Sequence, residues 1–140
     1  MASFNKINVF VENLAEKKHD LGADTLKVML TNSAPIATNS VKGDLTDISA
    51  GNGYTAGGTA ITVTASSQTS GTYKLVGDDV VFTASGAVGP FRYAVIYNDT
   101  QSSPAKPLIG WYDYGSSISL ANGETFTVDF DQSGGILTLA

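Results

Sequence analysis

The sequence has no cysteine and only one histidine, His19. Without thiols the fold cannot contain disulfides, thiolate metal sites or a cysteine nucleophile. A serine hydrolase would need His19 as its base, and the G-x-S-x-G turn of many such enzymes does not occur. We expect His19 to lie at the end of a helix, where the helix dipole favours a cation. The sequence therefore predicts a protein that is not an enzyme, with no catalytic, cofactor-binding or metal-binding residues.

Charge is also sparse. Only 15% of the residues are charged, and the net charge of -5 leaves no basic excess. Nucleic acids and anionic membrane surfaces are bound through clusters of Lys and Arg, so we expect neither as a partner. No stretch approaches the roughly 18 apolar residues of a membrane span, and no basic segment precedes an apolar run at the N-terminus. A basic protein surface would suit this composition better as a partner, although the need for solubility by itself explains an acidity of this size.

The 140 residues, 42% of them hydrophobic, are enough for one domain with its own core. We divide the domain into an N-terminal helical segment (1–22) and a β-rich body (23–140). The apolar residues of the first segment recur at spacings of three and four: Phe4, Ile7, Phe10, Val11 and Leu14. This stripe predicts an amphipathic helix from Ser3, its N-cap, to about Lys18, with Gly22 as the stop. A strand through Ile7, Val9 and Val11 is the alternative.

The body alternates polar and apolar residues, as strands do. Strands are predicted at 26–30, 59–65, 72–76, 80–84, 91–97, 108–113, 118–120, 124–130 and 136–139. A long Gly-rich loop occupies 35–58, and Asn122-Gly123 predicts a hairpin. We expect a mainly β fold, an antiparallel β-sandwich of jelly-roll-like or immunoglobulin-like type with one N-terminal amphipathic helix.

Alternation also predicts the core. The residues expected to be buried are Leu26, Val28, Leu30, Ile61, Val63, Phe82, Tyr93, Val95, Phe126, Val128 and Leu137. Both faces of the strand 91–97 are apolar, which is typical of a central strand.

Several carboxylates could form pairs or clusters, and each has a simpler structural role. Asp129 and Asp131 share a strand face, with Glu124 and Asp113 as possible neighbours, as in a glycosidase. Loop residues that could bind calcium are Asp44, Asp47, Asn52, Asp78 and Asp79. Their spacing matches no EF-hand, and such side chains commonly accept hydrogen bonds from their own turn. We expect solvated and turn-forming roles for all of them.

Six segments carry a resemblance to a known family: SFNKI (3–7), LAEK (14–17), DTLKV (24–28), GNGYTAGG (51–58), GPFRYAV (89–95) and IGWYDYG (109–115). Together they resemble small virion structural proteins of tailed bacteriophages. The resemblance covers nearly the full chain and carries no catalytic motif. The role that it implies is a head decoration, or cement, protein, which binds the major capsid protein on the outer surface of the capsid, often as a trimer.

Two segments are candidates for the partner contact. The N-terminal stripe must pack on the protein's own sheet or on a neighbour, and the glycines of the long loop permit close approach. The predicted partner-binding residues are Phe4, Ile7, Phe10, Val11, Gly51, Asn52, Gly53, Tyr54, Gly57 and Gly58. The alternative function is a tail-associated adhesin or carbohydrate-binding module, with Trp111, Tyr112 and Tyr114 as an aromatic platform. In a strand, Trp111 faces oppositely to Tyr112 and Tyr114, so we expect one of these two sets to lie in the core.

Overall fold

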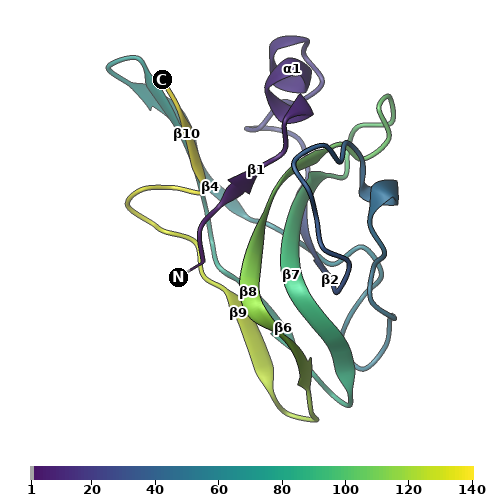
Figure 1. Ribbon diagram of the computed structural model, residues 1–140. Helices are drawn as coiled ribbons and strands as arrows, with labels where there is room; N and C mark the ends of the chain where they lie inside the picture. The colour runs from purple at the N-terminus through teal and green to yellow at the C-terminus, as the bar shows by residue number, and fades with distance from the viewer. Residues whose placement is uncertain (1) are drawn as a thin grey trace.

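The computed structural model of the protein describes residues 2–140. The fold is mainly β, with 47% strand and 7% helix, and every strand pairing is antiparallel (Figure 1). The helical elements are α1 (Val9–Ala15) and the short 3-10 helix η1 (Lys42–Asp44). The strands are β1 (Asn5–Lys6), β2 (Leu26–Thr31), β3 (Thr59–Ala60), β4 (Val63–Thr69), β5 (Thr72–Gly77), β6 (Val80–Thr83), β7 (Val88–Asn98), β8 (Leu108–Leu120), β9 (Thr125–Val128) and β10 (Leu137–Leu139). No helix among these residues is long and apolar enough to cross a bilayer.

The largest sheet has five strands in the order β1-β8-β7-β2-β3. The strand β7 lies at its centre, as the two apolar faces of 91–97 predict, and begins at Val88, three residues before the predicted start. The separate strands predicted at 108–113 and 118–120 are one strand, β8. Its pairing jumps from Tyr93–Asp113 to Phe91–Ile118, so a bulge takes up the polar residues between them without ending the strand.

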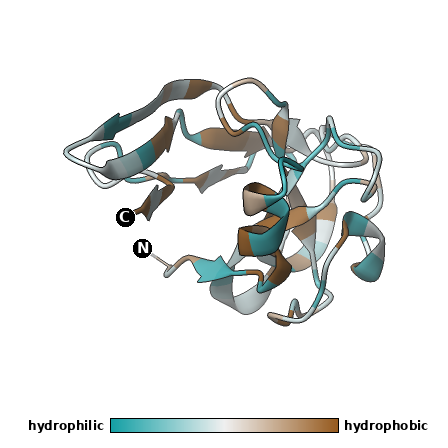
Figure 2. Ribbon diagram, turned by 90° about the horizontal axis from the view of Figure 1, so that it is seen from above, coloured by the Kyte–Doolittle hydropathy of each residue, from teal (hydrophilic) through white to brown (hydrophobic). Residues whose placement is uncertain are grey.

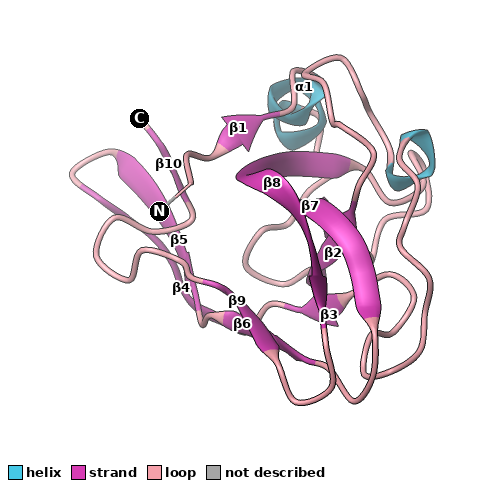
Figure 3. Ribbon diagram, turned by 60° about the horizontal axis from the view of Figure 1, so that its bottom comes forward, coloured by secondary structure: helices cyan, strands magenta, loops and turns pink. Residues whose placement is uncertain are grey.

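Two smaller sheets complete the fold, in the orders β10-β5-β4 and β6-β9. Figure 3 shows the β6-β9 ribbon alongside the five-stranded sheet, and the rings of Phe91 and Phe126 meet edge to face at 4.9 Å between them. The hairpin predicted at Asn122-Gly123 is wrong. A turn does form there, with the Glu124 N–H donating to the Ala121 carbonyl, but β8 and β9 belong to different sheets.

The N-terminal helix is shorter than predicted. Residues 5–6 form β1 and pair with β8, and the Ile7 N–H donates to the carbonyl of Ile109. These sheet hydrogen bonds outweigh the helical periodicity, so α1 begins only at Val9, with Asn8 rather than Ser3 as the N-cap residue. It ends at Ala15, before Lys17 turns the chain with a φ of 67°.

One hydrophobic core unites the N-terminal segment, the sheets and the long loop. Eight of the eleven predicted core residues are buried, whereas Val63, Tyr93 and Phe126 are half-buried at its margin. Figure 2 shows hydrophobic segments on α1 and on the strands beside it, and hydrophilic segments in the outer loops. Alternation therefore predicts most of these core residues correctly.

The centre of this core can be tested at Val95. It is fully buried and lies between Met29 of β2 and Trp111 of β8. We expect Val95→Ala to lower the free energy of unfolding by about 1–3 kcal/mol, because it leaves a cavity between paired strands. The matched control is Val81→Ala, at a position that is 51% exposed. It should change the free energy of unfolding, measured with urea, by less than about 0.5 kcal/mol. Equal effects of the two substitutions would contradict this assignment of the core.

Candidate functional site

The long loop 35–58 is fixed to the sheet by the carboxylate of Asp47. The Tyr54 hydroxyl donates to one carboxylate oxygen at 2.5 Å, and the Gly57 N–H donates to the other at 2.6 Å. The same Tyr54 hydroxyl accepts a hydrogen bond from the N–H of Leu30 at 3.0 Å, and this bond joins the loop to β2. Burial, together with the bond to Asp47, raises the pKa of Tyr54 far above its ordinary value. The loop is thus held by one buried and two partly buried hydrogen bonds.

Three residues in the later part of the loop belong to the core. Tyr54, Gly57 and Gly58 are buried, and the Tyr97 hydroxyl donates to the Gly57 carbonyl at 2.6 Å. At Gly58, whose φ is +82°, a Cβ would lie only 1.8 Å from the carbonyl oxygen of Val28. The GNGYTAGG run therefore needs Gly58 for packing against β2, whereas Gly57 packs against Tyr97 of β7. Their prediction as partner contacts is corrected accordingly.

The tip of the loop is exposed, at Gly51, Asn52 and Gly53. It is nevertheless anchored to the β6-β7 connection: the Asn52 side-chain amide donates to the Ala87 carbonyl at 2.9 Å, and the Ser85 N–H donates to the Asn52 carbonyl at 2.9 Å. We call these three residues, with the exposed Thr55 and Ala56, the loop-tip patch.

The N-terminal stripe packs mostly on the protein itself. Ile7 and Phe10 are 0% and 1% exposed, so their prediction as partner contacts is also corrected. Phe4 is half-buried, with its ring edge-on to Tyr112 at 5.7 Å. Val11 alone is well exposed, at 46%. It forms, with the exposed Glu12 and Ala15 of α1, what we call the helix patch.

The structure does not bring the two patches together. The segment leading into α1 pairs with β8 at Gly110 and Trp111. The connection that anchors the loop tip precedes Val88, which pairs with Leu120 at the other end of β8. The helix patch and the loop-tip patch therefore lie toward opposite ends of this long strand (Figure 1).

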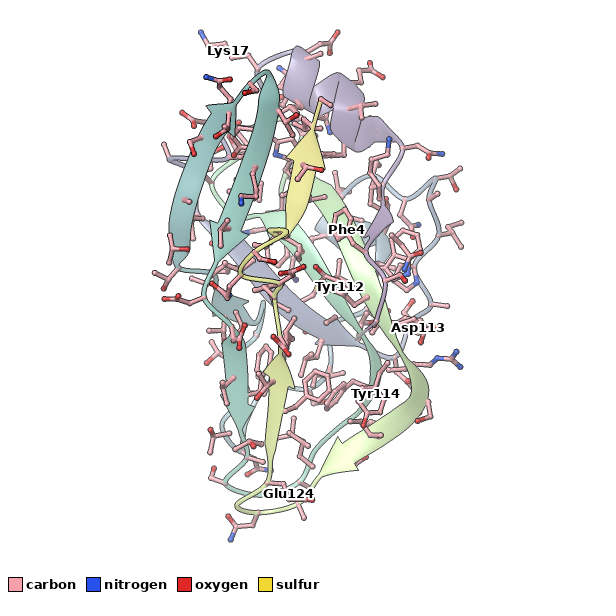
Figure 4. The ribbon with its side chains drawn as sticks, turned by 90° about the vertical axis from the view of Figure 1, so that its left-hand side faces the viewer. Phe4, Lys17, Tyr112, Asp113, Tyr114 and Glu124 are labelled. Carbon is pink, nitrogen blue, oxygen red and sulfur yellow. The ribbon has the colours of Figure 1, made fainter. Side chains whose placement is uncertain are left out.

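A groove between β8 and β9 is a third surface feature, and it was not predicted. The groove has a volume of about 250 Å³. Its floor is formed by Ala94, Tyr112 and Tyr114, and one wall by residues 126–129; Ala2 and Arg92 complete the lining. Figure 4 shows Tyr112 and Tyr114 lying toward β9, with Asp113 on the other side of β8. The predicted platform is therefore divided, because Trp111 shares the face of Asp113. The spacing of Tyr112 and Tyr114 was the available signal, but nothing in the sequence placed β9 beside them.

Three of the four candidate catalytic carboxylates hold local structure. Asp113 accepts two hydrogen bonds from Arg92, at 2.8 and 3.0 Å, and this pairing lowers its pKa. Asp131 accepts bonds from the backbone of Gly134 and Ser133, which lower its pKa as well. Glu124 accepts the N–H of Ala121. Across residues 2–140, no three His, Cys, Asp or Glu side chains are grouped to hold a metal ion.

His19 is buried beyond the end of α1, 5.3 Å from the ring of Phe10, rather than capping the helix. The Asn98 side-chain oxygen accepts the Thr100 N–H, so its amide group must donate to Asp24 at 2.7 Å and to His19 Nδ1 at 3.1 Å. Nδ1 is then an acceptor, and the proton of the neutral ring is on Nε2. This Nε2 is buried with no partner in the described chain. Burial lowers the pKa of His19, although the nearby charge of Asp24 opposes the shift.

This burial predicts a pH dependence of stability. The unfolded chain takes up a proton on His19 near its ordinary pKa of 6.5, whereas the folded protein does not. The free energy of unfolding should therefore fall as the pH decreases from about 6.5 toward the lowered pKa. Because Asp and Glu titrate nearer pH 4, the range of about pH 7 to 5.5 isolates this one group.

The control is His19→Asn, whose Oδ1 takes the place of Nδ1 and can accept the same bond from Asn98. Urea unfolding across that range should give a flat profile for the variant and a sloping one for the natural chain. Equal slopes in the two proteins would show that another group is responsible.

Comparison with models of protein families, with curated protein sequences and with solved structures finds no match to this chain. The surface features described above, namely the helix patch, the loop-tip patch and the groove between β8 and β9, are the candidates for binding a partner.

Proposed function

We propose that this protein is a non-enzymatic structural component of a phage virion. In this proposal it binds the major capsid protein on the outer surface of the head and stabilises the shell. The sequence resemblance suggests the role, and the separation of the two exposed patches along β8 is the observation that carries it. A protein that strengthens a shell must contact at least two neighbouring subunits, and two surfaces at opposite ends of a stiff sheet suit that task.

The fixed loop supports the same proposal. Asp47, Tyr54 and Gly57 hold the loop through partly buried hydrogen bonds, so its tip loses little conformational entropy when a partner binds. Glu12 in the helix patch and the net charge of -5 favour a basic surface beneath it. We also propose that the five-stranded sheet and the smaller sheets form a β-sandwich, as the contact of Phe91 with Phe126 suggests.

Binding to particles is the direct test. Purified heads lacking this protein should bind it in many copies and gain resistance to heat. Val11→Lys and Ala56→Lys place a cation on the helix patch and on the loop-tip patch, and each should weaken binding at least about tenfold by repelling a basic surface. The double variant should no longer stabilise the heads.

The control is Thr138→Lys, which adds the same charge at an exposed position of β10. It should bind like the natural chain. The proposal fails if the double variant binds as well as this control, and binding of only a few copies at the tail would support the adhesin alternative instead.

Self-association is a separate expectation. Symmetric oligomers let one surface patch serve several equivalent contacts, and we expect a trimer suited to threefold positions of the capsid. Sedimentation equilibrium should show the mass of three chains, or a reversible approach to it as the concentration rises. A strict monomer at high concentration would contradict a trimer in solution.

A further inference from the structure

The groove between β8 and β9 runs along the backbone edge of a strand. Four consecutive residues, 126–129, line its wall. Side chains of a strand alternate between its faces, so four in a row can line one groove only where the groove follows the main chain. The floor comes from side chains that share one face of the β7-β8 pair.

This edge of β9 is unpaired. Among residues 2–140, β9 pairs only with β6. The Ala84 N–H donates to the Glu124 carbonyl at the start of this ladder, and antiparallel ladders bond every second residue. Phe126 and Val128 therefore bond toward β6, and the N–H and C=O groups of Thr125 and Thr127 point to the other side. Both threonines are exposed, so these groups are available to another chain.

The floor offers a place for an apolar side chain. Tyr114 is 54% exposed although its ring lies 5.6 Å from Phe126, and Tyr112 lies 6.1 Å from Phe130. Burial raises the pKa of Tyr112 to about 12, as expected for a phenol in an apolar setting. Aromatic rings at this spacing beside a free strand edge are what strand-addition sites use for specificity, while the main chain supplies affinity.

The charges of the groove favour a basic occupant. The guanidinium of Arg92 is occupied by Asp113 through two hydrogen bonds. Asp129, at the end of the wall, is exposed and pairs with no Lys or Arg of the described chain. One uncompensated carboxylate is thus left in a chain whose net charge is already -5.

We propose that the groove binds an extended segment of a basic partner protein, which adds as a strand to the free edge of β9. The segment hydrogen-bonds to the main chain of Thr125 and Thr127, places an apolar side chain against Tyr112 and Tyr114, and brings a Lys or Arg to Asp129. The inference rests on the proposed function only in taking the partner to be a protein.

The probe is a displayed library of random nine-residue peptides, selected on the natural chain. Enriched peptides should combine an apolar residue with a nearby Lys or Arg. A synthetic copy of the best peptide should bind Thr127→Pro at least about tenfold more weakly than the natural chain, because proline removes the outward N–H at a position where an edge strand tolerates it. The matched control, Thr127→Ala, removes the side chain but keeps the N–H, and should bind normally.

Two further measurements keep the test independent of how Thr127→Pro folds. Two versions of the peptide are then methylated on every second backbone nitrogen, one on the odd-numbered and one on the even-numbered residues. Only one version should lose binding, because only every second N–H of an added strand bonds to β9. Asp129→Asn should weaken binding severalfold and reduce its dependence on salt. Equal binding of both methylated peptides, equal binding of Thr127→Pro and Thr127→Ala, or occupancy of the groove by a saccharide with no selected peptide would each overturn the proposal.

The outcomes also separate this inference from the proposed function. If heads do not bind the natural chain but peptides bind as described, the virion role fails and the groove remains a strand-addition site. If heads bind the natural chain while no peptide is selected, the groove assignment fails and the virion role remains.

Discussion

A strand can lie at the centre of this sheet only if both of its edges are paired and both of its faces are covered. β7 meets that condition: β2 and β8 pair with its edges, and Val95 and Ile96, on opposite faces, are both buried. Most other elements contribute to the same burial. The N-terminal segment supplies Ile7 and Phe10 to the core, and the long loop supplies Tyr54. The segments that look least globular in the sequence are therefore structural parts of the core.

The sequence predicted much of this core and less of its connections. Alternation located Leu26 to Leu30 and the central strand because the alternating pattern is formed by residues adjacent in the chain. It failed at the N-terminus, where pairing of Asn5 and Lys6 with a strand more than a hundred residues away replaced the first turn of the predicted helix. It failed again at Asn122-Gly123, since a turn motif specifies a change of direction but not which sheet receives the next strand.

The candidate sites were predictable to the same limited degree. The burial of Phe10, Tyr54 and Gly58 could not be predicted, because it depends on contacts with residues distant in sequence. The groove required knowledge that β9 runs beside Tyr112 and Tyr114. Fewer apolar residues are therefore exposed for binding than the sequence predicts. The exposed candidates are the helix patch, the loop-tip patch and the aromatic groove beside the unpaired edge of β9.

The hydroxyl of Tyr54 joins the loop to the sheet in a way that affects how the molecule opens. It accepts the N–H of Leu30, a fully buried residue of β2, while it donates to Asp47 within the loop. The loop cannot peel away without leaving a main-chain donor of the core unbonded, a cost that ordinary surface loops do not meet. Loop and sheet therefore form one cooperative unit. A protease that needs a locally unfolded substrate would have to wait for β2 itself to open.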